Sequence, residues 1–369
     1  MGDRDMRLRR IPLLVLGLAL GFALQWFAAV AQENRPPPVD PSLAPYASRK
    51  DSVRLPDGRT LHMVCIGQGS PVVILPTGSN GWGIGWNKVQ PAVAAKTRVC
   101  AWDRAGFGLS TGVPKPQTVD QSTTDLQAAL EAGRITGPYV AVGASLGADE
   151  SLLFKDREPN KVVGMVLVDP SFPDQVAREQ RAMSPALKAW GDAHPPPFLP
   201  FVQKCDAALR AGTLRPGGPD PDGCLHPQWP SDYPPELRAA LDKQIAESTP
   251  AALASAMEWM TSGSELNARN SMIAIKPGRD YGSMPLIVLT AQMGGPPGMP
   301  AELWPQAKLV LAEERRGHQE IAALSTRGVE RVVPDSPHDI SSAKPQVVIN
   351  AIDEVVDEAR GSTRATAER

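Results

Sequence analysis

Short apolar runs alternate with helical patterns along most of the chain, and this alternation restricts the folds that the chain can adopt. Runs typical of buried strands occur at residues 71–75, 97–102, 139–142 and 162–168. Helical patterns separate the last three of these runs, at residues 119–134 and 146–155. Strands that alternate with helices form a parallel sheet with helices on both faces, so the sequence predicts an α/β fold.

The alternation has two irregular regions. Near its start, runs at 52–55 and 59–66 flank the sequence Pro-Asp-Gly, which predicts a β-hairpin. From 171 to 282, strand signals are few and prolines are many, and helical patterns occur at 235–247 and 249–262. We therefore predict that residues 171–282 form a helical cap inserted into the α/β core.

The alternation resumes after this insertion. It continues with a strand at 285–290, a helix at 302–324, a strand at 328–333 and a helix at 346–359. The predicted α/β core thus comprises residues 51–170 and 283–360. Residues 361–369 are polar, and we predict a disordered tail there.

The first 31 residues have the pattern of an export signal. Arginines precede an apolar stretch that ends in Ala29-Val30-Ala31, a small-x-small sequence typical of a signal-peptidase site. An uncleaved membrane anchor is the alternative, because about 20 apolar residues can span a bilayer. Residues 32–50 are Pro-rich and predicted to be a linker. We expect a periplasmic or secreted protein, or an anchored one whose catalytic domain lies outside the cytoplasm.

The charge and the ligand-forming residues exclude several classes of partner. A net charge of −2 without a long basic run gives no indication of nucleic-acid binding, and a membrane contact is expected only if the N-terminal segment is uncleaved. His194, His226 and the cysteines do not have the spacing of a zinc site, and the segment before Cys224 lacks the spacing of a calcium loop. We expect a small-molecule substrate and no cofactor or metal. The oligomeric state is left open.

Four cysteines in an exported chain are candidates for disulfides. Cys205 and Cys224 flank a loop rich in Gly and Pro. A disulfide between them would stabilise the fold by about 2–4 kcal/mol by restricting the unfolded chain. Cys65 and Cys100 lie in predicted strands, where they are buried apolar residues unless the two strands are neighbours.

The sequence GASLG at residues 143–147 stands between a predicted strand and a predicted helix. Gly-x-Ser-x-Gly at such a junction is the pattern of a nucleophile elbow. The sharp turn requires small neighbours and places the Ser145 hydroxyl at the positive end of the helix dipole. The alternative is a glycine-flanked helix start in which Ser145 is only an N-cap.

A serine hydroxyl needs a base to act as a nucleophile. His338 follows the predicted strand at 328–333, and ligands meet an open α/β sheet at the carboxyl ends of its strands. We therefore predict that His338 is the base. His318, in a polar helical segment, is the reserve, and a loop histidine satisfied by local contacts is the alternative.

The base needs a carboxylate that orients it. Asp169 ends the strand after the serine's strand, so its carboxylate would lie on the same sheet edge as Ser145. Asp335 and Asp339 are the minor candidates, and a turn-forming role before Pro170 is the alternative for Asp169. The chain order Ser, Asp, His is the order that this triad takes on a hydrolase sheet.

A tetrahedral oxyanion needs backbone donors. We expect one from the amide of Leu146. The second is expected from the glycine-rich loop after the run at 71–75, at the amide of Ser79, with Asn80 next in line. An ordinary flexible glycine loop is the alternative.

These segments, taken in order, resemble the α/β-hydrolase superfamily. The resembling features are PVVILPTGSNGWGIGW, TRVCAWDRAGFGLS, VAVGASLGADES, VVGMVLVDPSFPDQ, PLIVLT and the region around His338. They cover residues 52–360 and are similar in particular to bacterial hydrolases with a cap after the sixth strand. The resemblance implies a mostly parallel, eight-stranded sheet with helices on both faces.

The resemblance also bears on single residues. It places the strands of Cys65 and Cys100 side by side, which makes a disulfide between them possible. It makes Asp103, in DRAGFGLS, a structural residue. Two features depart from the family pattern. No acid follows PLIVLT, where many members carry it, and Thr77-Gly78 replaces a His-Gly that often supports the oxyanion loop.

The expected activity is hydrolysis of an ester or related acyl bond through an acyl-enzyme. Acyl transfer, amide cleavage and peracid formation fit the same triad, and a non-catalytic binding protein is the alternative class. Dehalogenase and epoxide-hydrolase chemistry are disfavoured, because those relatives use an aspartate where this chain has Ser145. A set of large apolar residues either lines an acyl pocket or forms the core of the insertion: Trp190, Phe198, Phe201, Trp229, Trp259 and Met260.

Overall fold

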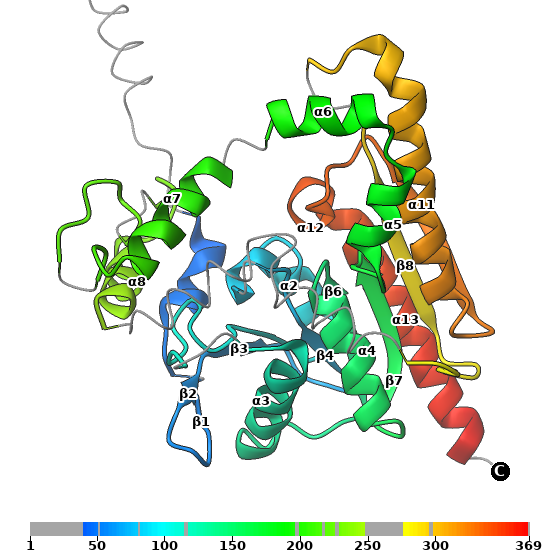
Figure 1. The fold of residues 1–369 in the computed structure, drawn as a ribbon. Coiled ribbons are helices and arrows are strands. Elements are labelled where there is room, and N and C mark those ends of the chain that lie inside the picture. Colours follow the sequence, from blue (N-terminus) through cyan, green and yellow to red (C-terminus); the bar gives the residue numbers. More distant parts are fainter. Residues whose placement is uncertain are drawn as a thin grey trace, which may run out of the picture.

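A seven-stranded sheet forms the centre of the protein (Figure 1). The computed structural model describes residues 40–367, except 51, 80–81, 114–116, 196–198, 216–217, 226–228, 248–275 and 295–297. Within these residues the strand order is β3-β5-β4-β6-β7-β8-β9. The pairing of β3 with β5 is antiparallel, and the other ladders are parallel. The predicted mostly parallel α/β sheet is confirmed.

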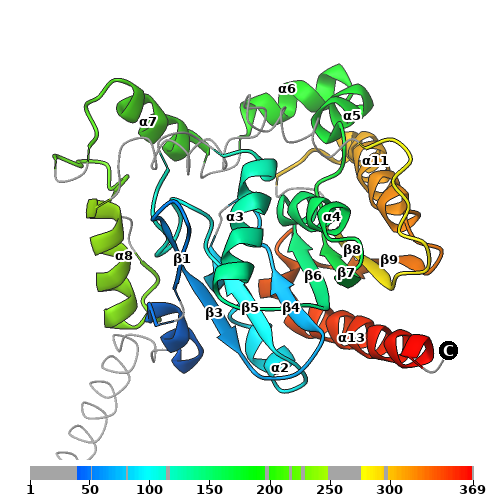
Figure 2. The ribbon, with the colours of Figure 1, turned by 90° about the horizontal axis from the view of Figure 1, so that it is seen from below.

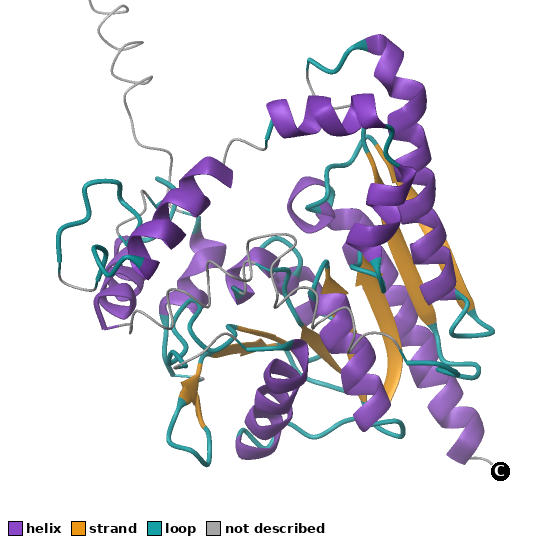
Figure 3. Cartoon of the chain, in the orientation of Figure 1, coloured by secondary structure: helices purple, strands orange, loops and turns teal. Residues whose placement is uncertain are grey.

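The strands are short, and all but the edge strand β9 are largely apolar. Their bounds are β3 (Met63–Ile66), β4 (Val72–Leu75), β5 (Val99–Trp102), β6 (Tyr139–Ala144), β7 (Val162–Val168), β8 (Leu286–Gln292) and β9 (Gly328–Pro334). Helices cover both faces of the sheet, as Figure 3 shows by colour. On one face lie α2 (Gln90–Ala94) and α13 (Pro345–Ala367), and on the other lie α3 (Val119–Ala132), α4 (Gly147–Arg157) and α11 (Trp304–Ala322) (Figure 2).

Alternate residues of the strands β3 to β8 belong to two separate cores on opposite faces of the sheet. Val73 and Leu75 of β4 belong to the core that contains Val348 and Ile352 of α13. Their neighbours Val72 and Ile74 belong to the opposite core, with side chains from α3 and α4. This is the period of two expected of a strand, and burial on both faces explains why these strands read as continuous apolar runs.

The sheet differs from the eight strands that the resemblance implied. The predicted strand at 59–66 is divided at His62, whose backbone N–H donates to the Ser110 hydroxyl at 2.8 Å. The part before it, β2 (Thr60–Leu61), pairs with β1 (Val53–Arg54) in a separate antiparallel pair. The part after it is β3. A side chain, in place of a neighbouring strand, thus satisfies the backbone at this point.

The insertion between β7 and β8 is helical where the structure describes it. It contains α5 (Gln175–Ala182), α6 (Pro185–Ala193), α7 (Leu199–Arg210) and α8 (Pro235–Glu247), whereas the helix predicted at 249–262 lies outside the described residues. Figures 1 and 2 show α5 and α6 beside α11, and α7 and α8 at the opposite side of the molecule. Arg178 of α5 forms ion pairs with Glu313 and Glu320 of α11.

Both ends of the core extend further than the sequence predicted. Part of the predicted linker forms the 3-10 helix η1 (Pro41–Ala47), whose Leu43 and Tyr46 are buried. The Tyr46 hydroxyl donates to Gln90. The last helix, α13, continues to Ala367, into the segment predicted to be disordered. The export segment lies outside the described residues, and within the described ones no helix has the length and apolar character needed to cross a membrane.

The structure contains two disulfides. Cys65 and Cys100 are directly opposite in the β3–β5 ladder and are bonded, as the resemblance made possible. Cys205 of α7 is bonded to Cys224. Buried Leu209, Leu214 and Leu225 surround this second bond in a small apolar cluster. The cluster and its disulfide hold the Gly/Pro-rich loop against α7.

Candidate active site

Ser145 occupies a tight turn between β6 and α4. Its backbone φ is +51°, in the left-handed region that non-glycine residues rarely adopt. A side chain on Gly143 would collide with backbone atoms of Gly147, and one on Gly147 would meet the carbonyl oxygens of Pro76 at 2.6 Å and Thr77 at 2.7 Å. Only glycine fits at either position. The small neighbours of Ser145 are therefore a steric requirement of this turn.

Backbone hydrogen bonds fix the turn to the next strand. The Ser145 N–H donates to the carbonyl of Val168 at 3.0 Å, and the Ser145 carbonyl accepts from the N–H of Ser171 at 3.1 Å. Val168 is the last residue of β7, so Asp169 lies directly beside the elbow. Two neighbouring parallel strands thus bring their carboxyl ends, and the polar residues that follow, to one point.

Asp169 links His338 to the backbone of β8. Nδ1 of His338 lies 2.6 Å from Oδ2 of Asp169, while Oδ1 of Asp169 accepts from the N–H of Ala291 at 2.8 Å. No acid follows β8 in the sequence. Instead, the amide of Ala291 in β8 donates to the carboxylate of Asp169, which follows β7. The hydrogen bond that the ring donates to the Asp169 carboxylate raises the pKa of His338 above its usual value.

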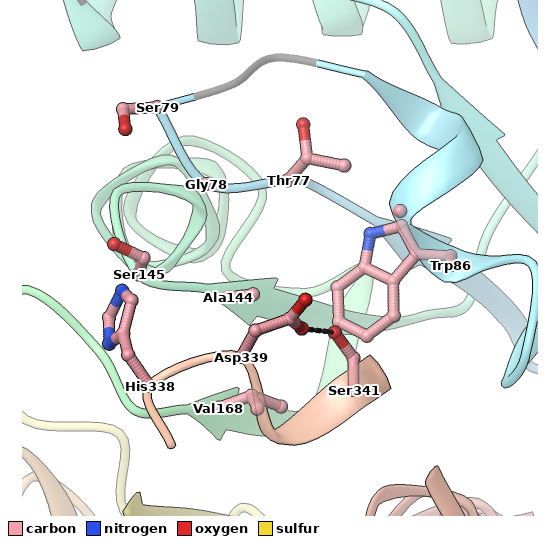
Figure 4. A pocket seen from close by; sticks show the side chains of 11 residues that line it. Thr77, Gly78, Ser79, Trp86, Ala144, Ser145, Val168, His338, Asp339 and Ser341 are labelled. Atoms are coloured by element: carbon pink, nitrogen blue, oxygen red, sulfur yellow. Dashed lines mark hydrogen bonds between the residues drawn. The ribbon is translucent and has the colours of Figure 1, made fainter. Parts of the chain in front are cut away.

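Ser145 and His338 line the same cavity, which has a volume of about 180 Å³. Figure 4 shows the imidazole of His338 beside the Ser145 side chain, with Thr77, Gly78 and Ser79 across the cavity. No described residue forms a hydrogen bond with the Ser145 hydroxyl in this structure. Such contacts are often long before a substrate binds.

The Ser79 and Leu146 amides lie on the two segments that border this cavity. Leu146 precedes the first residue of α4, and Ser79 lines the cavity wall (Figure 4). The next candidate, Asn80, lies outside the described residues. The helix dipole of α4 adds positive potential at its N-terminus, where an oxyanion would be stabilised.

Arg104 supports the segment that carries Ser79. Its guanidinium donates to the carbonyls of Thr77 and Gly78. Its Nε also donates to Oε1 of Glu150 at 2.6 Å, and both side chains are almost completely buried. The sequence reasoning missed this pair. The buried guanidinium of Arg104 thus holds the backbone of this loop. Many family members have a histidine next to the glycine of the loop, where this chain has Thr77.

The fold and this arrangement can be compared with known proteins. A family model for the alpha/beta hydrolase family matches residues 72–351. The chain belongs to the alpha/beta hydrolase family. A solved thermophilic esterase from Thermogutta terrifontis has a similar fold, with a TM-score of 0.50 and 18% identity over 84% of this chain and 98% of the esterase.

Two curated relatives match only part of the hydrolase. The uncharacterized protein C23C11.06c of Schizosaccharomyces pombe is 39% identical over 83 residues, which are 22% of this chain and 16% of that protein. The uncharacterized protein YqjL of Bacillus subtilis is 32% identical over 89 residues, 24% of this chain and 35% of that protein. The matched part of the hydrolase therefore spans well under two thirds of either relative.

The other candidate residues of the hydrolase have different surroundings. His318 is buried, and burial lowers its pKa. Its Nδ1 contacts the Thr290 hydroxyl and its Nε2 contacts the Pro170 carbonyl, both at 2.9 Å, so both ring nitrogens are occupied. Asp103 pairs with His62 at 2.7 Å, and its carboxylate accepts from the N–H of Leu109 in its own turn and from the N–H of Gly83.

The two minor aspartates do not form a hydrogen bond with His338 within the described residues. Asp339 instead caps α12 (Ile340–Ala343), where its Oδ1 accepts from the N–H of Ser342 at 3.1 Å. Asp335 adopts a positive φ of 49° in the loop before His338. Asp169 is therefore the aspartate that contacts the histidine ring.

A second, polar cavity of about 370 Å³ lies on the other side of Ser145 and His338. Its polar lining includes Gln175, Glu314 and Ser336. Glu314 makes no hydrogen bond or ion pair with any described residue. Burial, the nearby Glu179 and Asp169 raise the pKa of Glu314 to about 7. Sequence reasoning missed this residue, because nothing in its helical segment shows that it faces the site.

The large apolar residues of the insertion lie in different surroundings. Trp190 lines a third cavity, of about 540 Å³, between α6 and α11. Trp229 packs against Trp82 and Tyr233, so it serves as core, and Phe201 is 44% exposed. The remaining candidates lie outside the described residues: Phe198, Trp259 and Met260.

Proposed function

We propose that this hydrolase is a serine esterase with Ser145, His338 and Asp169 as its catalytic triad. The observation that carries the proposal is the hydrogen bond between His338 and Asp169 beside the Ser145 elbow. Nucleophile, base and orienting acid then stand at one sheet edge, in roles that each side chain can fill. The similar fold of the Thermogutta esterase is in keeping with this activity.

The reaction begins when the Ser145 oxygen attacks the acyl carbon and Nε2 of His338 takes the hydroxyl proton. Asp169 stabilises the imidazolium through Nδ1. The amides of Leu146 and Ser79 donate to the oxyanion of the tetrahedral intermediate. His338 then protonates the leaving alkoxide, and an acyl-enzyme remains on Ser145. A water activated by His338 releases the acid and restores the serine.

Covalent labelling tests the nucleophile directly. The wild-type protein should turn over p-nitrophenyl butyrate and react with a fluorophosphonate probe, and Ser145→Ala should do neither. Ser151→Ala is the matched control, because Ser151 lies on α4 with its hydroxyl bonded to the Gly147 carbonyl. It should keep both properties. A folded wild-type protein that neither turns over esters nor labels would refute the proposal.

We also propose that the mature enzyme acts outside the cytoplasm. Two disulfides support this, because such bonds persist in oxidising compartments. N-terminal sequencing of the protein from its native host should find a start near residue 32. A protein recovered only from the cytoplasm, with its first residues intact, would contradict export.

A further inference from the structure

The cavity between the cap and α11 is large and apolar. It lies among α5, α6 and α11 and has a volume of about 540 Å³. Its apolar lining comes from both sides: Met183, Leu187, Trp190, Met299, Trp304 and Val310. Lys188 and Asp192 also line it and form an exposed ion pair with each other.

This space is not filled by the side chains around it. Leu187 of α6 packs with Leu303, Ala307 and Val310 in an apolar cluster distinct from the two cores of the sheet. The volume falls in the range of pockets that bind small organic ligands. The cap and α11 therefore border a ligand-sized, mostly apolar cavity that is partly open to the surface.

The apolar cavity adjoins the candidate active site. Leu311 lines both this cavity and the polar cavity that contains Ser145 and His338. Gln175 faces the polar cavity and Glu179 the apolar one, and they are joined by a hydrogen bond of 2.7 Å. The two cavities are thus adjacent, and Leu311 and the hydrogen-bonded pair lie where they meet.

We propose that the hydrolase acts on amphiphilic esters, of which one arm runs from Ser145 through the polar cavity and ends in an apolar tail between α6 and α11. This inference rests on the proposed esterase function and names its substrate class. The polar cavity receives the part of the arm next to the scissile bond. Glu314 lines that cavity and has no hydrogen-bond or ion-pair partner among the described residues, and its pKa of about 7 lets it donate or accept a hydrogen bond there.

Chain-length panels test where the tail binds. One series is p-nitrophenyl esters from acetate to palmitate, which lengthens the acyl arm. The other is alkyl acetates from ethyl to hexadecyl, which lengthens the alcohol arm. In one of the two series, kcat/KM should rise about threefold to fourfold for each added methylene, until the cavity is filled.

Cavity-filling variants identify the site. Gly191→Trp on α6 adds an indole at a residue that lines the apolar cavity and at which an added Cβ meets no atom within 4 Å. It should lower kcat/KM for the long esters at least about tenfold and leave the shortest ester unchanged. Ala307→Trp fills the same space from α11 and covers the case in which the first variant misfolds. Leu309→Trp is the control, because Leu309 lies on the same helix and is 61% exposed.

The outcomes separate this inference from the proposed function. An enzyme that labels with fluorophosphonate but shows no chain-length dependence in either series would overturn the inference alone. Equal losses for short and long esters in both tryptophan variants would also overturn it. If no ester is turned over and no label is taken up, the esterase proposal fails. Binding of the amphiphilic dye 1-anilinonaphthalene-8-sulfonate by Ser145→Ala, and its loss in Ser145→Ala/Gly191→Trp, would still support an apolar occupant.

Discussion

Nδ1 of His338 lies 2.6 Å from Oδ2 of Asp169, although the two residues are 169 positions apart in the chain. The acid follows β7, and the amide of Ala291 at the end of β8 holds its second oxygen. The carboxylate is thus fixed from two strands before it meets the ring. This arrangement makes the role of Asp169 open to a direct test.

Asp169→Asn should lower kcat by about 10³–10⁴-fold, because an amide favours the wrong imidazole tautomer and does not stabilise the imidazolium. Steady-state kinetics with p-nitrophenyl butyrate would measure this. Asp335→Asn is the control. Asp335 lies three residues before His338 at a positive φ that asparagine also tolerates. The kcat of this variant should stay close to that of the wild type. A loss below tenfold in Asp169→Asn would remove Asp169 from the triad.

The acid limb of the pH–rate profile should report His338. The hydrogen bond that His338 donates to the Asp169 carboxylate raises the pKa of His338 above 6.5, and only the neutral ring accepts a proton. Activity should therefore fall as pH drops through a value above 6.5. In Asp169→Asn the acid limb of the residual activity should move to lower pH, because the carboxylate that raises the pKa of His338 is gone. A limb that does not move would show that another group controls it.

The raised pKa of His338 also affects the stability of the fold. A histidine whose pKa is higher in the folded state stabilises the fold below its unfolded pKa of about 6.5, and this gain is lost as pH rises through the folded pKa. Asp169→Asn should therefore lose more stability at acidic than at alkaline pH. Thermal unfolding across this range would measure the difference. The effect should be small, since the His338 side chain is 65% exposed.

Features with a local signal could be predicted from the sequence. Ser145 and Asp169 each end an apolar run, and parallel strands bring such ends together without further information. Features that depend on distant partners could not. Arg104 and Glu150 are 46 positions apart with no shared pattern, and Leu43 and Tyr46 lie in a Pro-rich stretch that resembles a linker. Whether Trp190 faces a cavity or a core depends on how α6 meets α11, which no periodicity encodes.

Gly147→Ala should disrupt the elbow. The added methyl would meet the carbonyl oxygens of Pro76 and Thr77, backbone atoms that cannot rotate away. We expect a loss of about 1–3 kcal/mol in the free energy of unfolding and a fall in kcat, because the loop that carries Ser79 must shift. Gly191→Ala is the matched control, since its methyl meets no atom within 4 Å. Equal stability and activity of the two variants would contradict the steric argument.

Glu150→Gln should lower the free energy of unfolding more than the loss of a surface ion pair does. It leaves the Arg104 charge buried without its counter-ion, which typically costs about 3–5 kcal/mol. The guanidinium also holds the Thr77 and Gly78 carbonyls, so kcat should fall as well. Glu354→Gln is the control, because its pair with Arg331 is about 40% exposed and worth under about 1 kcal/mol. Urea unfolding of both variants would measure the contrast, and comparable effects would show that the buried pair is not structural.

Asp149 should make the fold less stable at alkaline pH. It is buried on α4, and burial raises its pKa to about 8, with the neighbouring Glu150 adding to the effect. No described residue bonds its Oδ1. A carboxyl whose pKa is raised on folding is favoured in its neutral form, so stability declines as pH rises from the unfolded pKa near 4 through about 8.

Asp149→Asn replaces this group by a neutral one of the same shape, so the decline should be smaller in the variant. Melting temperatures measured from about pH 6 to about pH 9.5 would test this. Asp192→Asn serves as the control, because its side chain is 69% exposed and its curve should parallel the wild type. Parallel curves for wild type and Asp149→Asn would mean that Asp149 is already ionised in the folded protein. A charged Asp149 beside Glu150 would then require compensation from Arg279, the nearby cation that favours its ionised form.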